Sequence, residues 1–388
     1  MNSLQLLDRL IAFPTVSRDS NLELIGFVRG YLESLGARCR LVFNSERTKA
    51  NLFASVGPPN SPGVLLSGHT DVVPVDGQDW TSDPFRLTRI GDRLYGRGTA
   101  DMKGFLACAL SAAAAASGCR LTIPLWLAFS YDEELGCIGV RRLIDVMVED
   151  GLQPLFCIVG EPTSLAVATG HKGKTSLQAI CRGKAAHTAF APRAVNALHL
   201  ACDFVGALRR VQTEILAEGA SDPEFEVPCT TLHAAGISGG IAANIVPDRS
   251  VVDFEIRNIA ADRPSGLIER LTRDAVAIVA ATGVPETDAG IRLQIINDYP
   301  GLATDADNWA VTFVRSLAGS NSSCKVAFGT EAGLFAERVR TPAVICGPGS
   351  MEQGHKADEF ISYRQMQRCD AMLAELVKHL ESGSIPTG

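Results

Sequence analysis

The chain has 388 residues, more than one hydrophobic core usually serves, so its length favours two domains. Hydrophobic residues make up 46%, charged residues 20% and the net charge is −7, which suits a globular protein and argues against a nucleic-acid binder. The 11 cysteines are scattered without a C-x-x-C pair, which argues against a disulfide framework and a thiolate zinc site.

The sequence also predicts a protein without a membrane partner. The opening residues, MNSLQLLDRLIAF, lack a basic region ahead of a long apolar core, so no signal peptide is expected. No run approaches the roughly 18 apolar residues that a membrane helix needs. The unpaired cysteines favour a reducing compartment, so the expected location is the cytoplasm.

The first predicted elements are amphipathic helices followed by buried strands. Leucines recur at helical spacing over residues 4–11 behind Ser3, a residue type that commonly caps helices. A second helix is predicted over residues 22–35, with Gly36 as its stop, and an Ala-rich helix over residues 102–117. Strands are expected at residues 38–43, 51–57, 64–68, 123–130 and 155–160. This alternation is typical of an α/β domain with a mainly parallel sheet flanked by helices.

The pattern changes near residue 175. Four amphipathic strands and two long helices follow, which predicts an antiparallel sheet with one face covered by helices. After residue 298 the α/β pattern resumes and closes on a helix over residues 363–381. We therefore predict an α/β domain formed by residues 1–174 and 299–388, and an α+β domain inserted between them at residues 175–298.

Imidazole and carboxylate side chains follow the strands of the larger predicted domain. They are His69, Asp71, Glu133, Glu134, Glu161 and His355, with Asp101 at the entrance to the Ala-rich helix. Each alone has an ordinary explanation as a helix cap, a turn acid or a surface histidine. Ligands of open α/β sheets bind at the carboxyl ends of the strands, where all these residues are expected. Their shared placement, with three consecutive acids at 132–134, favours a metal site.

The residue types narrow the choice of metal. Histidine with carboxylates and without cysteine suits zinc, cobalt or manganese, whereas calcium prefers oxygen ligands alone. Five ligands are too many for one catalytic zinc ion that keeps an open position. Two ions that share a bridging carboxylate, about 3.5–4 Å apart, fit better.

Five stretches resemble the di-zinc amidohydrolase and metallopeptidase family that includes acetylornithine deacetylase, succinyl-diaminopimelate desuccinylase and aminoacylase. They are SGHTDVVPVDGQDWTSDPF, LYGRGTADMKGF, SYDEELGCIG, GEPT and GHKADEF, and the likeness covers essentially the whole chain. Within the family, VVPVDGQDW, GTEAGLF and CGPGSMEQGHKADEFI look most like the acetylornithine deacetylases. The resemblance implies hydrolysis of N2-acetyl-L-ornithine to L-ornithine and acetate in arginine biosynthesis, by attack of a zinc-bound hydroxide.

The resemblance also implies roles for the candidate residues. His69, Asp101 and Glu161 would hold one zinc ion, and Asp101, Glu134 and His355 the other, with Co²⁺ able to substitute. Glu133 would act as general base and acid. Asp71 would accept a hydrogen bond from the His69 imidazole, and the Asp101–Met102 peptide would be cis.

For the inserted domain the resemblance implies a lid that also forms a homodimer. His187 would donate to the oxyanion across the dimer interface, and Asn244 and Arg257 would contact the substrate carboxylate and amide. Charge matching suggests that Glu331 meets the ornithine ammonium group. A turn histidine at His187 and a salt-bridged surface arginine at Arg257 stay open as alternatives.

Two other functions stay open. The same chemistry fits another N-acyl amino acid, such as N-acetylcitrulline or succinyl-diaminopimelate, or a dipeptide. A non-catalytic binding protein of the same fold is a remote alternative. Its expected signature, loss of a ligand or of the base, is not present in this sequence.

Overall fold

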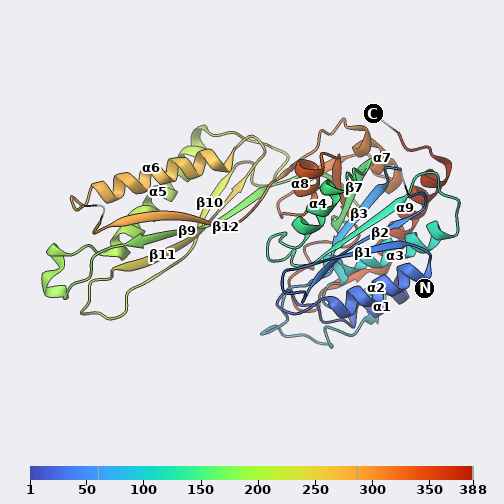
Figure 1. Ribbon diagram of the computed structural model, residues 1–388, viewed down its shortest axis with the longest axis horizontal. Coiled ribbons are helices and arrows are strands. Elements are labelled where there is room, and N and C mark those ends of the chain that lie inside the picture. The colour runs from blue at the N-terminus through green and yellow to red at the C-terminus, as the bar shows by residue number, and fades with distance from the viewer. Residues whose placement is uncertain (60, 286, 387–388) are drawn as a thin grey trace. The chain divides into compact units, whose positions relative to one another are not determined.

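The chain divides into two units (Figure 1). Each unit has its own hydrophobic core. The computed structural model describes residues 1–59, 61–285 and 287–386. The larger unit comprises Met1–His171, Leu302–Val326 and the chain from Thr330 onward. The smaller unit comprises Lys172–Gly301 and Ala327–Gly329, so it interrupts the larger unit in sequence.

A mixed sheet of nine strands forms the centre of the larger unit, in the order β1-β2-β6-β3-β7-β15-β8-β13 with β14 beside β8. The strands are β1 (Arg38–Phe43), β2 (Ala50–Val56), β3 (Val64–His69), β6 (Leu125–Ser130), β7 (Phe156–Pro162), β8 (Val167–His171), β13 (Leu302–Ala303), β14 (Ser323–Val326) and β15 (Ala343–Gly347). The central strands β6, β3, β7 and β15 run parallel and are buried along their whole length. Burial on both faces explains why they read as unbroken apolar runs, and the predicted fold class is confirmed.

Helices flank this sheet. They are α1 (Ser3–Ile11), α2 (Leu22–Ser34), η1 (Thr99–Lys103), α3 (Gly104–Ser117), α4 (Val140–Glu149), α7 (Trp309–Ala318), α8 (Ala332–Leu334), η3 (Phe335–Val339) and α9 (Tyr363–Ser382). The Ala-rich α3 is apolar on all sides, and it is enclosed because α1 and α9 both pack against it. Among the described residues, no helix combines the length and apolar character needed to cross a membrane.

The predicted cap of the first helix is wrong by one residue. Asn2 is the N-cap, because its side chain accepts from the Gln5 amide at 2.9 Å and the Gln5 side chain accepts from the Asn2 amide. Ser3 lies inside the helix, and its hydroxyl donates to Asp370 at 2.5 Å. Gly36 has a φ of +80°, as its predicted role as the stop of the second helix requires.

A small sheet in the order β16-β5-β4 carries the loop that leads into η1. Its strands are β4 (Thr88–Ile90), β5 (Arg93–Tyr95) and β16 (Phe360–Ser362). Phe360 is paired with Tyr95 in antiparallel register. Glu359, the residue before β16, therefore lies next to Gly96, the residue after β5.

The smaller unit is an antiparallel sheet in the order β10-β11-β9-β12 with two long helices (Figure 1). Its elements are β9 (Gly173–Arg182), η2 (Thr188–Arg193), α5 (Ala197–Glu218), β10 (Thr231–Gly239), β11 (Arg249–Asn258), α6 (Pro264–Ala280) and β12 (Gly290–Tyr299). Buried and half-buried residues alternate along β9, as in a strand with one covered face. Leu177 and Ala179 share a core cluster with Phe204 of α5 and Leu271 of α6.

Candidate metal centre

The candidate site lies at the carboxyl ends of the parallel strands in the larger unit. β3 ends at His69, and β6 ends at Ser130, directly before the acidic run 132–134. Glu161 lies near the end of β7, and His355 lies in the chain that follows β15. Because neighbouring parallel strands end at the same edge of a sheet, these side chains meet there.

Asp101 lies between two histidines. Its Oδ1 atom is 3.0 Å from Nε2 of His69, and its Oδ2 atom is 3.2 Å from Nε2 of His355. Nε2 of His355 is also 3.1 Å from Oε2 of Glu134, and Nε2 of His69 is 3.8 Å from Oε1 of Glu161. The two carboxylate oxygens of Asp101 thus face two different sets of ligand atoms, as in a carboxylate that bridges two cations. The Asp101–Met102 peptide is cis.

The side chains present fit divalent metal ions. In two groups, each side chain offers one ligand atom within 4.8 Å of the others: His69, Glu133 and Glu161, and His69, Asp101 and Glu134. Oε1 of Glu161 is buried and has no hydrogen-bond partner among the described residues. Such an orphaned oxygen is costly unless a cation satisfies it. Imidazole nitrogen with carboxylate oxygen is the donor chemistry of zinc and related transition metals.

The charges at the site depend on one another. Burial raises the pKa of Glu133 and of Glu161 well above the usual range. Burial acts in the same direction on Asp101, but hydrogen bonds from His355 and His69 outweigh it and lower its pKa. Hydrogen bonds to Asp101 and Glu134 raise the pKa of His355 to about 10. The carboxylate cluster therefore attracts positive charge, which the imidazoles or a bound cation can supply.

The structure gives Asp71 a different contact from the predicted one. Nδ1 of His69 is 2.9 Å from the backbone carbonyl oxygen of Asp71, whereas carboxylate Oδ1 is 3.6 Å away. The carboxylate instead accepts from the backbone amides of Glu133 at 3.1 Å and Glu134 at 3.3 Å, and from the Ser17 hydroxyl at 2.7 Å. The carbonyl of Asp71 thus orients the His69 ring, and its carboxylate holds the acidic loop.

The three consecutive acids have three different partners. Glu134 faces His355, as described above. Asp132, which had no predicted role, pairs with Nζ of the largely buried Lys49 at 2.5 Å. Glu133 accepts a hydrogen bond from Sγ of Cys137 at 3.3 Å. A thiol is a weak donor, so this contact leaves the Glu133 carboxylate able to exchange a proton.

Glu331 lies in the interior of the larger unit, directly before α8. Its side chain is 1% exposed and accepts from the hydroxyls of Ser130 at 2.5 Å and Ser67 at 3.3 Å. Burial raises its pKa to about 7. Each carboxylate oxygen keeps a free lone pair, but the side chain is closed to solvent, and its contact with the ornithine ammonium group stays a prediction.

His187 and Asn244 are neighbours in the smaller unit. A β-bridge joins His187 to Ile245, and the amide of Thr188 donates to the carbonyl oxygen of Asn244 at 3.2 Å. Both side chains are exposed. Nδ1 of His187 accepts from the amide of Ala189 at 3.1 Å, which leaves the ring proton on Nε2.

Arg257 lies far from that pair in the same sheet. It is paired with Lys174 in register, and its Nε is 2.9 Å from Oε1 of Glu255, so it has the salt bridge of the alternative interpretation. His187 follows Arg182 at the other end of β9. From Lys174 to Arg182 the strand spans about 27 Å at about 3.4 Å per residue. One small substrate cannot contact both His187 and Arg257 of the same chain.

Two charged residues beside the site were not among those predicted from the sequence. Arg97 and Glu359 form an ion pair at 2.7 Å, and each side chain is 1% exposed. Glu359 is part of the GHKADEF stretch, four residues after His355, and this proximity was the available signal.

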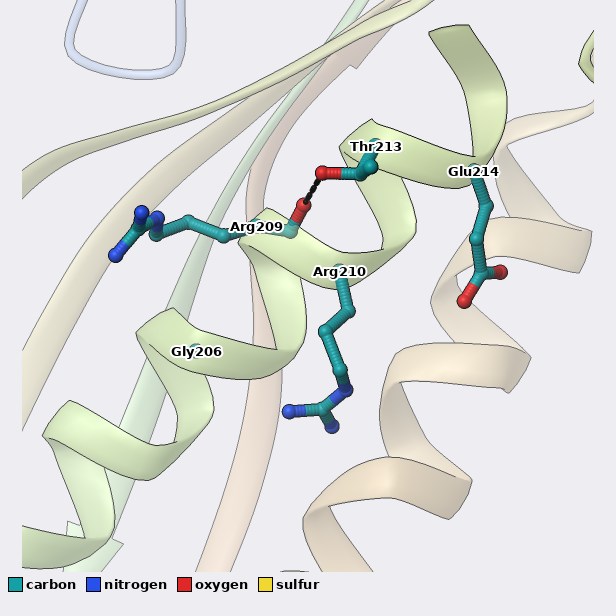
Figure 2. Close-up of a pocket in the computed structure, with 5 residues that line it drawn as sticks. All are labelled: Gly206, Arg209, Arg210, Thr213 and Glu214. Atoms are coloured by element: carbon teal, nitrogen blue, oxygen red, sulfur yellow. Dashed lines mark hydrogen bonds between the residues drawn. The ribbon is translucent and has the colours of Figure 1, made fainter. Parts of the chain in front are cut away.

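A hollow of about 440 Å³ on the smaller unit is lined by other residue types than the histidine and carboxylate cluster at the sheet edge (Figure 2). It is lined by Gly206, Arg209, Arg210, Thr213 and Glu214 of α5. Figure 2 shows the Thr213 hydroxyl donating to the carbonyl oxygen of Arg209, at 2.9 Å. Arginines with a single carboxylate offer no metal-ligand set, so the candidate site is the one at the sheet edge.

Two curated proteins are similar to this chain in sequence over nearly its full length. Acetylornithine deacetylase from Pasteurella multocida is 33% identical over 388 residues, 98% of each chain. The acetylornithine deacetylase of Myxococcus xanthus is 35% identical over 390 residues, 97% of each chain.

Two solved structures share the fold at low identity. An M20 family metallo-carboxypeptidase from Sulfolobus solfataricus has a TM-score of 0.78 at 18% identity, covering 98% of this chain and all of that one (100%). A dinuclear metal-binding peptidase of the M20 family from Bacillus subtilis has a TM-score of 0.71 at 14% identity, covering 100% of this chain and 98% of that one.

The sequence profile of Peptidase family M20/M25/M40 matches residues 65–379, a span that includes every ligand candidate from His69 to His355. The profile covers most of the chain, and the two acetylornithine deacetylases align with 97–98% of it. The chain therefore belongs to peptidase family M20/M25/M40, whose members are metal-dependent hydrolases.

Proposed function

We propose that this hydrolase removes the acetyl group from N2-acetyl-L-ornithine, and that it does so in the cytoplasm as a step of arginine biosynthesis. The position of Asp101 between His69 and His355 carries the hydrolytic part of the proposal, because it suits a pair of metal ions. The relatives that cover 97–98% of the chain and are named acetylornithine deacetylase support the choice of substrate.

Two zinc ions, which Co²⁺ can replace, are the proposed cofactors. His69, Asp101 and Glu161 would hold one ion, and Asp101, Glu134 and His355 the other. When bound, the ions supply Lewis-acid chemistry that polarises the amide carbonyl and acidifies water.

The chain's own residues then handle the proton. Glu133 accepts a proton from the attacking water and returns it to the nitrogen of the leaving amine. The Asp71 carboxylate keeps Glu133 in place by accepting hydrogen bonds from the backbone amides of Glu133 and Glu134. His187, with its proton on Nε2, donates to the oxyanion that forms on the carbonyl.

We further propose that the smaller unit is both a lid and the dimerisation domain. Arg257 pairs with Lys174 near one end of β9, and His187 follows Arg182 at the other end, about 27 Å further along the strand. Both can therefore serve one substrate only if they come from different chains. The proposal thus assigns Arg257 to its own chain's site, and His187 with its neighbour Asn244 to the site of a second copy.

Removal of the metal is the first test. Dialysis against a chelator is expected to lower hydrolysis of N2-acetyl-L-ornithine by at least about 100-fold, because the charge stabilisation and the activated water are lost together. Adding Zn²⁺ or Co²⁺ to the stripped protein should restore acetate release, whereas Mg²⁺ should not, because it disfavours imidazole. Full activity in metal-free protein would refute the proposed chemistry.

A panel of N-acyl amino acids tests the substrate. We expect kcat/KM for N2-acetyl-L-ornithine to exceed that for N-acetylcitrulline, which lacks the ammonium charge, by at least about tenfold. Succinyl-diaminopimelate and a dipeptide complete the panel, measured with zinc-loaded protein. Equal values for acetylornithine and acetylcitrulline would mean that no group reads the ammonium charge. A higher value for another member would reassign the substrate and leave the hydrolytic chemistry intact.

A further inference from the structure

Glu359 is a buried carboxylate that none of the proposed catalytic steps uses. Its Oε1 atom accepts from the backbone amides of Ala100 at 2.9 Å and Asp101 at 3.1 Å. Its Oε2 atom accepts from the amide of Gly98 at 2.9 Å and from Nη1 of Arg97 at 2.7 Å. Four donors from residues 97–101, the loop after β5 and the first turn of η1, therefore converge on one side chain, and this segment ends at the proposed bridging ligand.

The loop needs such an acceptor because its backbone is irregular. Gly98 has a φ of +85°, and Ala100 and Asp101 lie in the first turn of η1, where backbone amides have no intrahelical acceptor. Buried amides without a regular partner must find another acceptor. The carboxylate of Glu359 takes that place, and its own carbonyl oxygen accepts from the Gly96 amide at 3.0 Å.

Arg97 extends the contact to the other ligand-bearing segments. Its Nη1 donates to the carbonyl oxygen of Lys356 at 3.2 Å, and its Nη2 to Oε1 of Gln78 at 2.5 Å. Nε2 of Gln78 in turn donates to the carbonyl oxygen of His355 at 3.2 Å. The guanidinium group thus joins the segment after His69 to the segment that carries His355.

We infer that the Arg97–Glu359 pair is a positioning unit for the metal centre, fixing the segments that carry His69, Asp101 and His355 relative to one another. Neither side chain is a metal ligand. A buried ion pair stabilises a fold little in itself, since desolvation offsets the attraction, and in some proteins its role is to specify one arrangement of its partners. Here that arrangement places both oxygens of Asp101 opposite the two histidines.

The inference rests on the proposed metal centre, and Glu359→Gln tests it. Glutamine keeps the shape but turns an NH₂ group toward amides that need an acceptor. We expect the folded variant to bind Zn²⁺ about 10–100-fold more weakly, measured by competition with a zinc-binding dye, as is usual for residues that orient metal ligands. Circular dichroism would establish that the variant is folded.

Asp370→Asn is the matched control. Asp370 is a partly buried carboxylate of α9 that accepts from Ser3, so the substitution removes a hydrogen-bonded charge elsewhere in the same unit. It is expected to leave zinc affinity unchanged, because Asp370 contacts Ser3 of α1 and not the metal centre. If Glu359→Gln does not fold, Glu359→Asp replaces it, because aspartate keeps the charge opposite Arg97 but cannot reach all four donors.

The outcomes separate two failures. Unmodified protein that does not bind Zn²⁺ refutes the proposed metal centre itself. Unmodified protein that binds Zn²⁺, with a folded Glu359 variant that binds it equally well, overturns the positioning role alone. Weaker binding in the Glu359 variant but not in Asp370→Asn supports it.

Discussion

Glu133→Gln is expected to lower kcat for N2-acetyl-L-ornithine by about 10³-fold while the protein keeps its zinc. Glutamine has the shape of glutamate but cannot accept a proton from water or return it to the leaving amine. The backbone amide of Glu133 would still donate to Asp71, so the acidic loop should keep its place. Steady-state kinetics and the zinc content of the same purified sample are the two measurements.

Glu134→Gln is the matched control, because it makes the same change at the next residue. Glu134 faces Nε2 of His355 at 3.1 Å as a proposed ligand, so this variant should lose zinc as well as activity. The geometry leaves a real alternative for Glu133, which forms a group of ligand atoms with His69 and Glu161. If Glu133→Gln loses zinc to the same extent as Glu134→Gln, Glu133 is a ligand and the base must be sought elsewhere.

The sequence predicted the sheet and its polar edge for a physical reason. Strands such as β3 and β6 are buried on both faces, so they appear as apolar runs, and a histidine or an acid directly after such a run is conspicuous. Parallel strands end at one edge, so residues that follow different strands could be placed together without knowing the exact order of the strands. His69, Glu134 and Glu161 were placed in this way.

Contacts with the backbone of distant segments could not be predicted. Three of the four donors to Glu359 are main-chain amides, which every residue type carries, so the letters of the loop do not identify them. The same holds for Asp71, whose carboxylate accepts hydrogen bonds from the backbone amides of Glu133 and Glu134, 62 and 63 residues further along the chain. Asn2 and Ser3 are equally good caps locally, and a contact between Ser3 and Asp370 helps to distinguish them.

His187→Ala is expected to lower kcat by about 10²–10³-fold, the usual effect of removing one oxyanion donor, without loss of zinc. His199→Ala is its control, since His199 is an exposed histidine on α5 of the same unit with no proposed role. The stronger test combines the His187→Ala chain with the Glu133→Gln chain, each with its own affinity tag, and purifies the mixed dimer.

The mixed dimer distinguishes a histidine that serves its own chain from one that serves its partner. If His187 acts across the interface, one of the two sites receives an intact Glu133 and an intact His187, and about half the activity of the unmodified dimer should return. If His187 acts within its own chain, every site carries one defect and the mixture stays as inactive as its parents. Lys174, which pairs with the proposed substrate contact Arg257, and Arg182, which precedes His187, are about 27 Å apart along β9, and this favours the first outcome. Activity restored in the mixed dimer would also establish the dimer as the functional unit, since two defective chains can complement each other only when each completes the other's site.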